Sequence, residues 1–373
     1  MRKNRIIFLL WILLWMLIWI SGGRNEALLI IAASVISAVC DALLVRRTLR
    51  GLAAELRCAA SVAKGQELRL CLHIKNASIL SCAGGSLALE CENLLTGERE
   101  SRIVGFAVSG KSEAEICASF SFSHCGRVRF RADKLSCFDM LGLLGFSQSV
   151  ELETAVLVQP QLYATRLEIS AGQVYDAESN EYSMYRSGFD ASETYALREY
   201  KAGDPIKNIH WKLSQKSDEL ILRELGLPIQ NSLLILIENA AADELSEVCS
   251  ADTAEAMGEI AVSLSMALCE QKYEHRIAWT DCEKGQVEAC EIGCEEDLNT
   301  VMSGILSAGL CGGAYGTAEQ LAEQKGELEY AHIIVITPSS AEPGLPQAAS
   351  AAVTWLHAVE HRTLKEKGIY AEV

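Results

Sequence analysis

The sequence predicts a multidomain protein with an N-terminal transmembrane helical hairpin, an antiparallel β-sandwich and a doubly wound α/β domain. Three observations support this. Two long apolar runs open the chain, polar–apolar alternation follows, and the last third alternates continuous apolar runs with helical stripes. The expected boundaries are 1–50 for the helices, 52–160 for the sandwich, 161–230 for a linker with a polar motif, and 231–373 for the α/β domain.

The first 50 residues predict two membrane-spanning helices, at about 6–22 and 27–45. The first run is unbroken over 6–20, and the second is interrupted only by two serines and an aspartate. At about 1.5 Å per residue these runs reach roughly 22 and 28 Å, against roughly 30 Å of hydrocarbon core. A signal peptide is the alternative, which the second run and the lack of a small-residue cleavage site disfavour.

Charge and cysteine usage predict where the soluble part resides. Basic residues precede the first run and follow the second, so the positive-inside rule places both ends of the hairpin in the cytoplasm. The 14 cysteines include no Cys-x-x-Cys, and residues such as Cys71 and Cys117 have the pattern of small buried hydrophobes. This usage suits a reducing compartment. We therefore expect a two-span protein of the cell membrane with cytoplasmic soluble domains.

The charge distribution excludes one class of partner. Residues 1–50 carry seven Lys or Arg against two acidic residues, a net +5, which leaves −21 for the rest out of the total of −16. A body this acidic repels phosphate backbones, so we expect no nucleic-acid binding.

Alternation over about 55–158 predicts an antiparallel sandwich of about seven short strands. In 68–74 every second residue is apolar, and the same pattern recurs at 116–122 and 127–131. Turn signals such as Lys64-Gly65, Gly84-Gly85 and Thr96-Gly97 separate the runs.

The last third predicts parallel strands joined by helices. Strands are expected at 233–237, 276–280, 333–337, 353–356 and 368–373, with helices at 251–271 and about 298–306. Ligands on such sheets bind beyond the carboxyl ends of the strands. No glycine-rich dinucleotide motif and no phosphate-loop lysine is present.

The densest polar and aromatic specificity lies between the two soluble domains, in an Arg-Glu-Tyr-x-x-Gly-Asp … Ile-x-Trp-Lys motif with a Leu-Arg-Glu downstream. We call these residues the signature: Arg198, Glu199, Tyr200, Gly203, Asp204, Ile209, Trp211, Lys212 and Arg223. A second pattern, Gly126-Arg127 to 138–143 (Phe-Asp-Met-Leu-Gly-Leu), ends the β region. With the double-span anchor, these motifs resemble the bacterial "domain of unknown function 58" proteins over most of 1–240.

The resemblance implies a von Willebrand factor type A fold for the C-terminal half. It also implies an association with MoxR-type AAA+ ATPases and transglutaminase-like membrane proteins. The type A fold often binds a divalent metal through Asp-x-Ser-x-Ser and a later Thr and Asp. Here the first three positions are Glu238, Ala240 and Ala242, and Thr337 is followed by Pro338. We therefore expect a degenerate site with no metal and no cofactor; weak cation binding by Glu238 with Asp243 and Glu244 is the alternative.

Catalysis is a further alternative. His210 near Asp204 and Glu199 could relay a proton, with Ser214 or Ser217 as nucleophile, but no nucleophile-elbow pattern supports a hydrolase. A zinc site at Cys282, Cys290 and Cys294 is disfavoured because paired Cys-x2–4-Cys spacings are missing.

The structural interpretation of the signature is an ionic clamp. Arg198 and Arg223 would pair with Glu199, Asp204 or Glu224, and Trp211 and Tyr200 would pack beneath. We therefore expect no enzyme, but a membrane-anchored scaffold or interaction protein whose signature presents a surface to a protein partner. A MoxR-type AAA+ ATPase in envelope-related assembly is the expected partner. The third hypothesis is a divalent-metal-dependent adhesion-type domain.

Overall fold

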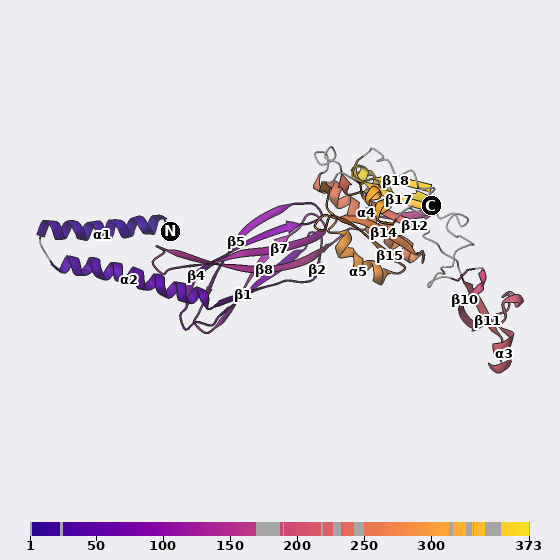
Figure 1. Cartoon of the computed structure of the whole chain (residues 1–373), viewed down its shortest axis with the longest axis horizontal. Coiled ribbons are helices and arrows are strands. Elements are labelled where there is room, and N and C mark those ends of the chain that lie inside the picture. The colour runs from indigo at the N-terminus through magenta and orange to yellow at the C-terminus, as the bar shows by residue number, and fades with distance from the viewer. Residues whose placement is uncertain are drawn as a thin grey trace. The chain divides into compact units, whose positions relative to one another are not determined.

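The computed structural model describes residues 2–22, 25–168, 187–188, 190–217, 219–226, 233–241, 250–312, 316–325, 330, 332–339 and 352–372 (Figure 1). The chain forms two compact units. Unit 1 comprises 1–93, 98–123 and 128–158, and unit 2 comprises 94–97, 124–127 and 159–373.

Two antiparallel helices open unit 1, α1 (Arg2–Gly22) and α2 (Asn25–Arg50), and they run side by side (Figure 1). Both are long and apolar enough to cross a membrane, with mean hydropathies of 2.1 and 2.5 over their best windows. The indole of Trp11 donates to Ser34 Oγ at 3.3 Å and joins the two helices. The helical range of α2 extends five residues beyond the predicted span.

The helix pair is tied to one loop of the sandwich. Asn4 Nδ2 and Arg5 Nε donate to the carbonyls of Leu141 and Leu143, and Asp41 Oδ2 accepts from the backbone of Met140. Met140 is largely exposed. The loop formed by the second sequence pattern, 138–143, therefore contacts α1 and α2 of the same unit.

The rest of unit 1 is an eight-stranded antiparallel β-sandwich, one strand more than predicted. Its strands are β1 (Leu52–Arg57), β2 (Ser61–Ala63), β3 (Glu67–Asn76), β4 (Cys82–Asn93), β5 (Arg99–Val108), β6 (Glu113–Ser121), β7 (Gly126–Phe138) and β8 (Gly145–Gln159). They form the sheets β1-β3-β6 and β2-β8-β7-β4-β5. The predicted alternation is confirmed in β3, where Leu68, Leu70, Leu72 and Ile74 are buried. They share one core with Leu87, Phe130 and Val158 of the other sheet, because period-2 patterning turns one face of each strand inward.

Two disulfides contradict the expectation that the cysteines are free buried hydrophobes. Cys71 in β3 and Cys117 in β6 face each other across the sheet and are bonded. Cys282 is bonded to Cys311 in unit 2. Alternation alone could not reveal these pairs, because it does not determine which strands become neighbours. The disulfides also remove the cysteine argument for a reducing compartment, since such bonds persist mainly in oxidising ones.

Unit 2 is built on a five-stranded sheet of order β15-β14-β12-β17-β18. Its strands are β12 (Leu233–Ile237), β14 (His275–Asp281), β15 (Gln286–Ile292), β17 (His332–Thr337) and β18 (Ala352–His357). Its helices are α4 (Ala251–Glu270), α5 (Glu295–Ile305), α6 (Thr317–Lys325) and α7 (His361–Lys367), with a 3₁₀ turn η2 (Ala358–Glu360). All pairings are parallel except β14–β15. The apolar runs of β12 and β17 are buried throughout, which is why they lack alternation.

The set of strands predicted for this sheet differs from the observed set at two places. The fifth strand of the sheet is β15, an antiparallel hairpin partner of β14 that the sequence analysis did not identify. The predicted last strand, β19 (Ile369–Glu372), pairs instead with β9 (Thr165–Glu168) in the expected linker. Short β13 (Ala240–Ala241) and β16 (Cys311–Gly312) also pair with each other. β9 and β19 have four residues each, and the composition of so short a strand does not specify its neighbour. β15 is seven residues long, but its mixed sequence is neither continuously apolar nor strictly alternating.

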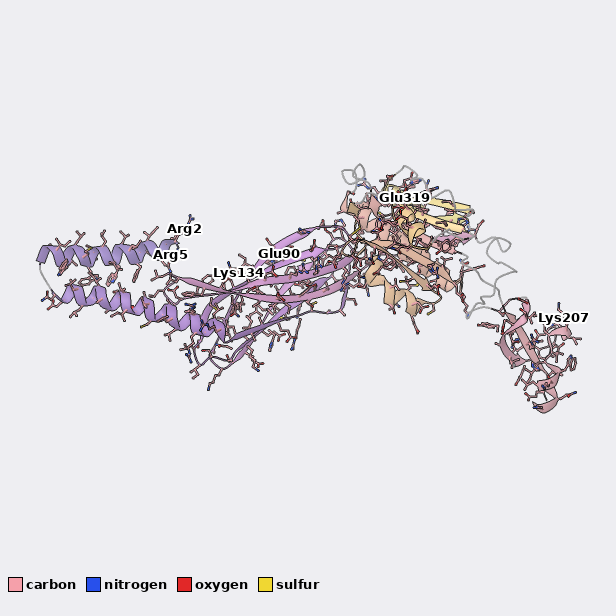
Figure 2. All side chains as sticks on the ribbon, in the orientation of Figure 1. Arg2, Arg5, Glu90, Lys134, Lys207 and Glu319 are labelled. Atoms are coloured by element: carbon pink, nitrogen blue, oxygen red, sulfur yellow. A yellow bond between two sulfur atoms is a disulfide. The ribbon has the colours of Figure 1, made fainter. Side chains whose placement is uncertain are left out.

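The signature residues form a small module of their own. It consists of β10 (Asp190–Glu199), a 3₁₀ turn η1 (Ile206–Asn208), the short helix α3 (Trp211–Ser217) and β11 (Ile221–Gly226). Strands β10 and β11 are antiparallel, with Arg198 opposite Leu222. Lys207 in η1 is exposed and labelled in Figure 2. We refer to residues 190–226 as the signature module.

Candidate functional site

The guanidinium of Arg198 is the centre of the signature module. Its two terminal nitrogens donate to the two carboxylate oxygens of Asp204, at 2.6 and 2.9 Å. Its Nε donates to Glu224 Oε1 at 2.8 Å. A planar guanidinium that meets a carboxylate with two parallel bonds fixes direction as well as distance. Arg198 therefore holds the η1 turn, β10 and β11 in one arrangement.

The electrostatics of this clamp persist over the physiological pH range. The hydrogen bond from Arg198, and then that from the backbone of Lys201, lower the pKa of Asp204 to about 2. A carboxyl group with a pKa below its unfolded value of about 3.9 contributes stability above that value. The contribution is lost as pH falls through about 2, so the clamp remains ionised at neutral pH.

Gly203 supplies the sharp turn that brings Asp204 back to Arg198. Its φ is 109°, in a region that side-chain-bearing residues rarely adopt. The turn closes with a hydrogen bond from Asp204 N to the carbonyl of Lys201 at 3.0 Å. Beneath it, Ile209 and Leu222 are buried and meet in an isolated β-bridge.

Part of the predicted clamp is wrong. Arg198 selects Asp204 and Glu224, and its contact with Glu199 goes to the backbone carbonyl rather than to the carboxylate. Arg223 donates to the carbonyl of Ala191 instead of pairing with an acid. Adjacent residues of a strand point to opposite faces, which separates the two arginines.

The signature aromatics do not pack beneath the clamp as predicted. Trp211 is 56% exposed and Tyr200 is half-buried; Lys212 is exposed beside the indole. The first residue of a seven-residue helix has little of its own chain to pack against. Trp211 is thus available to another molecule.

His210 and Ser214 shape the turn before β11. Leu213 N donates to His210 Nδ1 at 3.2 Å. The hydroxyl of Ser214 donates to the carbonyl of His210 and accepts from Ile221 N at 2.9 Å. These bonds bind the hydroxyl to the backbone, an arrangement that does not prepare it for attack on a substrate. Ser217 ends α3, and its side chain lies outside the described residues.

Exposed apolar side chains are concentrated on the signature module. Its large exposed apolar residues are Tyr195, Leu197, Ile206, Trp211 and Leu220. Among the described residues of 233–372, the comparable side chains are only Val359 and Tyr370. An excess of exposed apolar groups on a short segment marks an interaction surface more often than it marks chance.

The carboxyl edge of the unit 2 sheet has the opposite character. Glu238 follows β12 and is buried, and its two oxygens accept from the backbone N–H groups of Thr317 and Ala318 at 2.5 and 3.2 Å. Burial raises the pKa of Glu238, and these two bonds oppose the rise. The carboxyl group therefore caps the first turn of α6.

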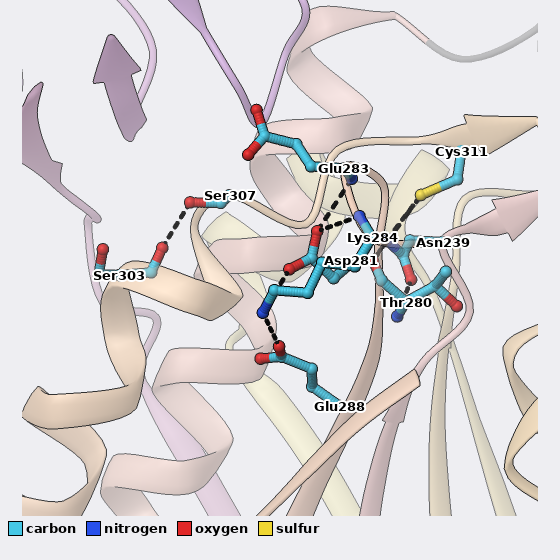
Figure 3. Close-up of polar contacts among 9 residues, drawn as sticks. All are labelled: Asn239, Thr280, Asp281, Glu283, Lys284, Glu288, Ser303, Ser307 and Cys311. Atoms are coloured by element: carbon cyan, nitrogen blue, oxygen red, sulfur yellow. Dashed lines mark hydrogen bonds and ion pairs between the residues drawn. The ribbon is translucent and has the colours of Figure 1, made fainter. Parts of the chain in front are cut away.

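Asn239 organises the same edge (Figure 3). It is fully buried, and its Nδ2 donates to the carbonyls of Thr280 and Gly309 at 2.8 and 2.9 Å. Its Oδ1 accepts from Thr280 N at 2.8 Å and from the Thr317 hydroxyl at 3.3 Å. Nearby, the Cys282–Cys311 disulfide joins the turn after β14 to β16. Sequence analysis missed Asn239 and Thr317, although Asn239 directly follows a buried strand.

The described positions of the expected degenerate metal site are used structurally. Ala240 lies in β13, opposite Cys311, and Thr337 Oγ1 accepts from Ser339 N at 3.4 Å. Ala242, Asp243 and Glu244 lie outside the described residues. With both Glu238 oxygens accepting backbone hydrogens, this donor set does not fit the type A metal arrangement. Cys282 is bonded to Cys311, so it is not available as a ligand for the zinc site considered above.

Comparison with known proteins assigns no family. No protein-family model matches the chain, and no curated protein matches it. Similar solved structures include the CARDB domain of a Pyrococcus furiosus protein in complex with di-metal ions, at 15% identity, TM-score 0.22, covering 29% of this chain and 87% of that one.

Two further structures are similar to the same limited extent. A β-glucosidase from Erythrobacter marinus has 10% identity and a TM-score of 0.23, over 29% of this chain and 15% of its own. A cohesin module of a Clostridium perfringens family 33 glycoside hydrolase has 7% identity and a TM-score of 0.23, over 30% and 98%. Similarity at this level supports no functional argument. The chain begins with two long apolar helices and continues into β-rich domains, and its own residues are the basis for a function.

Proposed function

We propose that the chain is a membrane-anchored interaction protein whose signature module binds a protein partner. The observation that carries this proposal is the exposure of Trp211 and Ile206 on a segment whose backbone is clamped by Arg198. A surface that is rigid before binding loses less conformational entropy on association. Trp is also among the residues that contribute most to interface affinity.

The chemistry of the module indicates the kind of partner. Charged side chains of both signs are exposed around its apolar side chains, namely Lys201, Lys207, Lys212, Lys216, Glu193, Glu199 and Glu219. An apolar groove with a rim of mixed charge would complement this combination. The family resemblance suggests a MoxR-type AAA+ ATPase, with a role in envelope-related assembly. The bonded state of Ser214 favours binding over hydrolysis.

Unit 2 is, we infer, a von Willebrand factor A-like domain that carries the module. Support comes from its central parallel strands, with Glu238 at the end of β12 where the resemblance expects the first metal-site position. In this inference the domain supports the partner surface through its fold and not through a bound cation.

Binding of a purified MoxR-type ATPase of the same organism to the full chain in detergent micelles tests the function. Trp211→Ala and Ile206→Ser should each weaken the complex by at least about tenfold, as expected for residues at the centre of an interface. Arg198→Ala and Asp204→Ala should weaken it through loss of the clamp. Tyr370→Ala, at a side chain equally exposed (54%) but outside the module, is the matched control. Equal affinity of all folded variants would refute the proposal.

We infer that the soluble domains lie in the cytoplasm, because basic residues flank both helices on that side. The two disulfides argue for the opposite side. Green fluorescent protein fused to the C-terminus distinguishes these orientations, because it matures poorly after export in unfolded form. Fluorescent membranes are expected, whereas dark membranes together with an active alkaline phosphatase fusion would reverse the orientation.

A further inference from the structure

A mixed cluster of metal-ligating side chains lies in unit 2 and includes none of the signature residues or of the sheet-edge residues Glu238 and Asn239. Asp252, Glu255 and Glu259 are spaced three and four residues apart on α4, so they share one face of the helix. The segment 124–127 of the same unit brings His124 and Cys125 to this face. Of the five, Glu255, Glu259 and Cys125 are buried.

The outer part of the cluster has the geometry of a ligand set. His124 Nε2 lies 3.1 Å from Asp252 Oδ1. One ligand atom each of His124, Asp252 and Glu255 lie within 4.8 Å of one another. Zinc bonds of about 2.0–2.2 Å at a tetrahedral angle place neighbouring ligand atoms roughly 3.4 Å apart. Small side-chain adjustments would therefore let the three share one ion.

The inner part continues the same set. Cys125 Sγ and the carboxylates of Glu255 and Glu259 also lie within 4.8 Å of one another. Glu255 belongs to both groups, and its Oε1 accepts from Cys125 N at 2.6 Å, which fixes the carboxylate between them. Cys125 is in no disulfide.

The hydroxyl of Tyr163 borders the inner part of the cluster. Tyr163 is only 8% exposed. Burial raises the pKa of Tyr163, and the Glu259 carboxylate beside it raises the pKa further through its charge and a hydrogen bond. A buried hydroxyl of this kind can bond to the carboxylate or to water held there.

We propose that His124, Asp252 and Glu255 bind a divalent ion of the zinc class, with Glu259 and Cys125 behind them. Histidine nitrogen and carboxylate oxygen are both zinc ligands, and three such ligands leave the fourth tetrahedral position for water or for Cys125. Lys365, whose Nζ is 3.5 Å from Glu259 Oε2, already balances the inner carboxylate. The ion thus occupies the outer group, where Asp252 is open to solvent.

Calorimetry with Zn²⁺ on the full chain, stripped with chelator in detergent, tests the site. We expect one ion per chain, and affinity lost by more than about 100-fold in His124→Ala and in Glu255→Gln, since even outer-shell partners contribute roughly 10–100-fold. Co²⁺ offers a second readout. Its visible absorption bands should report tetrahedral coordination. If the Cys125 sulfur is the fourth ligand, the wild-type chain shows a near-ultraviolet thiolate band that Cys125→Ser removes. If water is the fourth ligand, neither chain shows this band.

A matched control is available in unit 1. His73 Nε2 lies 3.4 Å from Glu113 Oε2, a similar exposed His–carboxylate pair outside the cluster, so His73→Ala should retain full stoichiometry. Circular dichroism must show that each variant is folded. The proposal is overturned if the wild-type chain binds no Zn²⁺, or if folded His124→Ala and Asp252→Asn bind it as tightly as wild type. His124 and Asp252 would then form an ion pair only.

Discussion

The signature module and the carboxyl edge of the unit 2 sheet use polar side chains in opposite ways. At the sheet edge, Glu238 and Asn239 are buried and bonded to backbone groups on three other segments. In the module, one ionic clamp around Arg198 holds a small scaffold whose large apolar side chains face solvent. Buried and satisfied polar groups specify a fold, whereas exposed apolar groups on a fixed backbone are available for recognition. The edge therefore has the properties of structure, and the module those of a binding surface.

The largest expected effect is at Asn239. Asn239→Leu keeps the branched shape of the side chain but leaves Thr280 N and two carbonyls without their partner in a buried site. Each unsatisfied buried group costs about 1–3 kcal/mol, so the free energy of unfolding should fall by about 4 kcal/mol. Urea unfolding of the full chain, followed by circular dichroism, measures it. A loss under about 1 kcal/mol would show that the edge is not the structural element described.

Removal of the disulfide at the same edge should have the next largest effect on the free energy of unfolding. The double variant Cys282→Ser, Cys311→Ser opens a loop with a sequence separation of 29 residues, and the free energy of unfolding should fall by about 3 kcal/mol. Reductant should destabilise the wild-type chain at least as much, because it also opens the Cys71–Cys117 disulfide. Cys290→Ser, at a half-buried cysteine that is in no disulfide and lies between the two in the sequence, is the control and should change little. Insensitivity of the wild type to reductant would mean that the bond does not form in solution.

Glu238→Gln should have a smaller effect on the free energy of unfolding, and it should change how that free energy depends on pH. Because burial raises the pKa of Glu238, the folded state holds the proton more tightly than the unfolded state, and this stabilisation is present at low pH. It is lost as pH rises through the folded pKa. The glutamine still accepts a backbone hydrogen bond, so stability at pH 7 should change by less than about 1 kcal/mol and this part of the pH dependence should disappear. Loss of divalent-cation binding in the variant would instead identify a working metal site.

The smallest expected effect on stability is at Trp211. Its exposure means that Trp211→Ala should change the free energy of unfolding by no more than about 0.5 kcal/mol, although partner binding weakens strongly. Melting curves and binding measured on the same preparations separate the two quantities. A large loss of stability would place the indole in a core, and the contrast with the sheet edge would fail.

Long periodic segments were predictable because their patterns depend on local neighbours. The helix expected at 251–271 is α4, and its apolar stripe, which includes Met257, Ile260 and Leu264, is buried as expected. The runs at 233–237 and 333–337 are strands within one residue of expectation. β13 has only two residues, too few to show a period, and it was missed. β15 has seven residues but was also missed, because its sequence Gln-Val-Glu-Ala-Cys-Glu-Ile is neither continuously apolar nor strictly alternating.

The candidate site was predictable in composition but not in pairing. The prediction left Glu199, Asp204 and Glu224 open as partners of Arg198 and Arg223. The structure pairs Arg198 with Asp204 and Glu224 and directs Arg223 to the Ala191 carbonyl. The exposure of Trp211 contradicts the expectation for a large aromatic residue, since a short helix offers it no surface to pack against.

By itself, the sequence determined the two apolar helices, the alternating strands, the buried central strands and the position of the signature, because hydropathy and turn chemistry act on residues close in the chain. Only the tertiary structure decided which distant groups meet. It joined Cys282 to Cys311, Glu238 to the first turn of α6, and His124 to Asp252. Such contacts depend on how strands and helices are ordered in space, and no local pattern encodes that order.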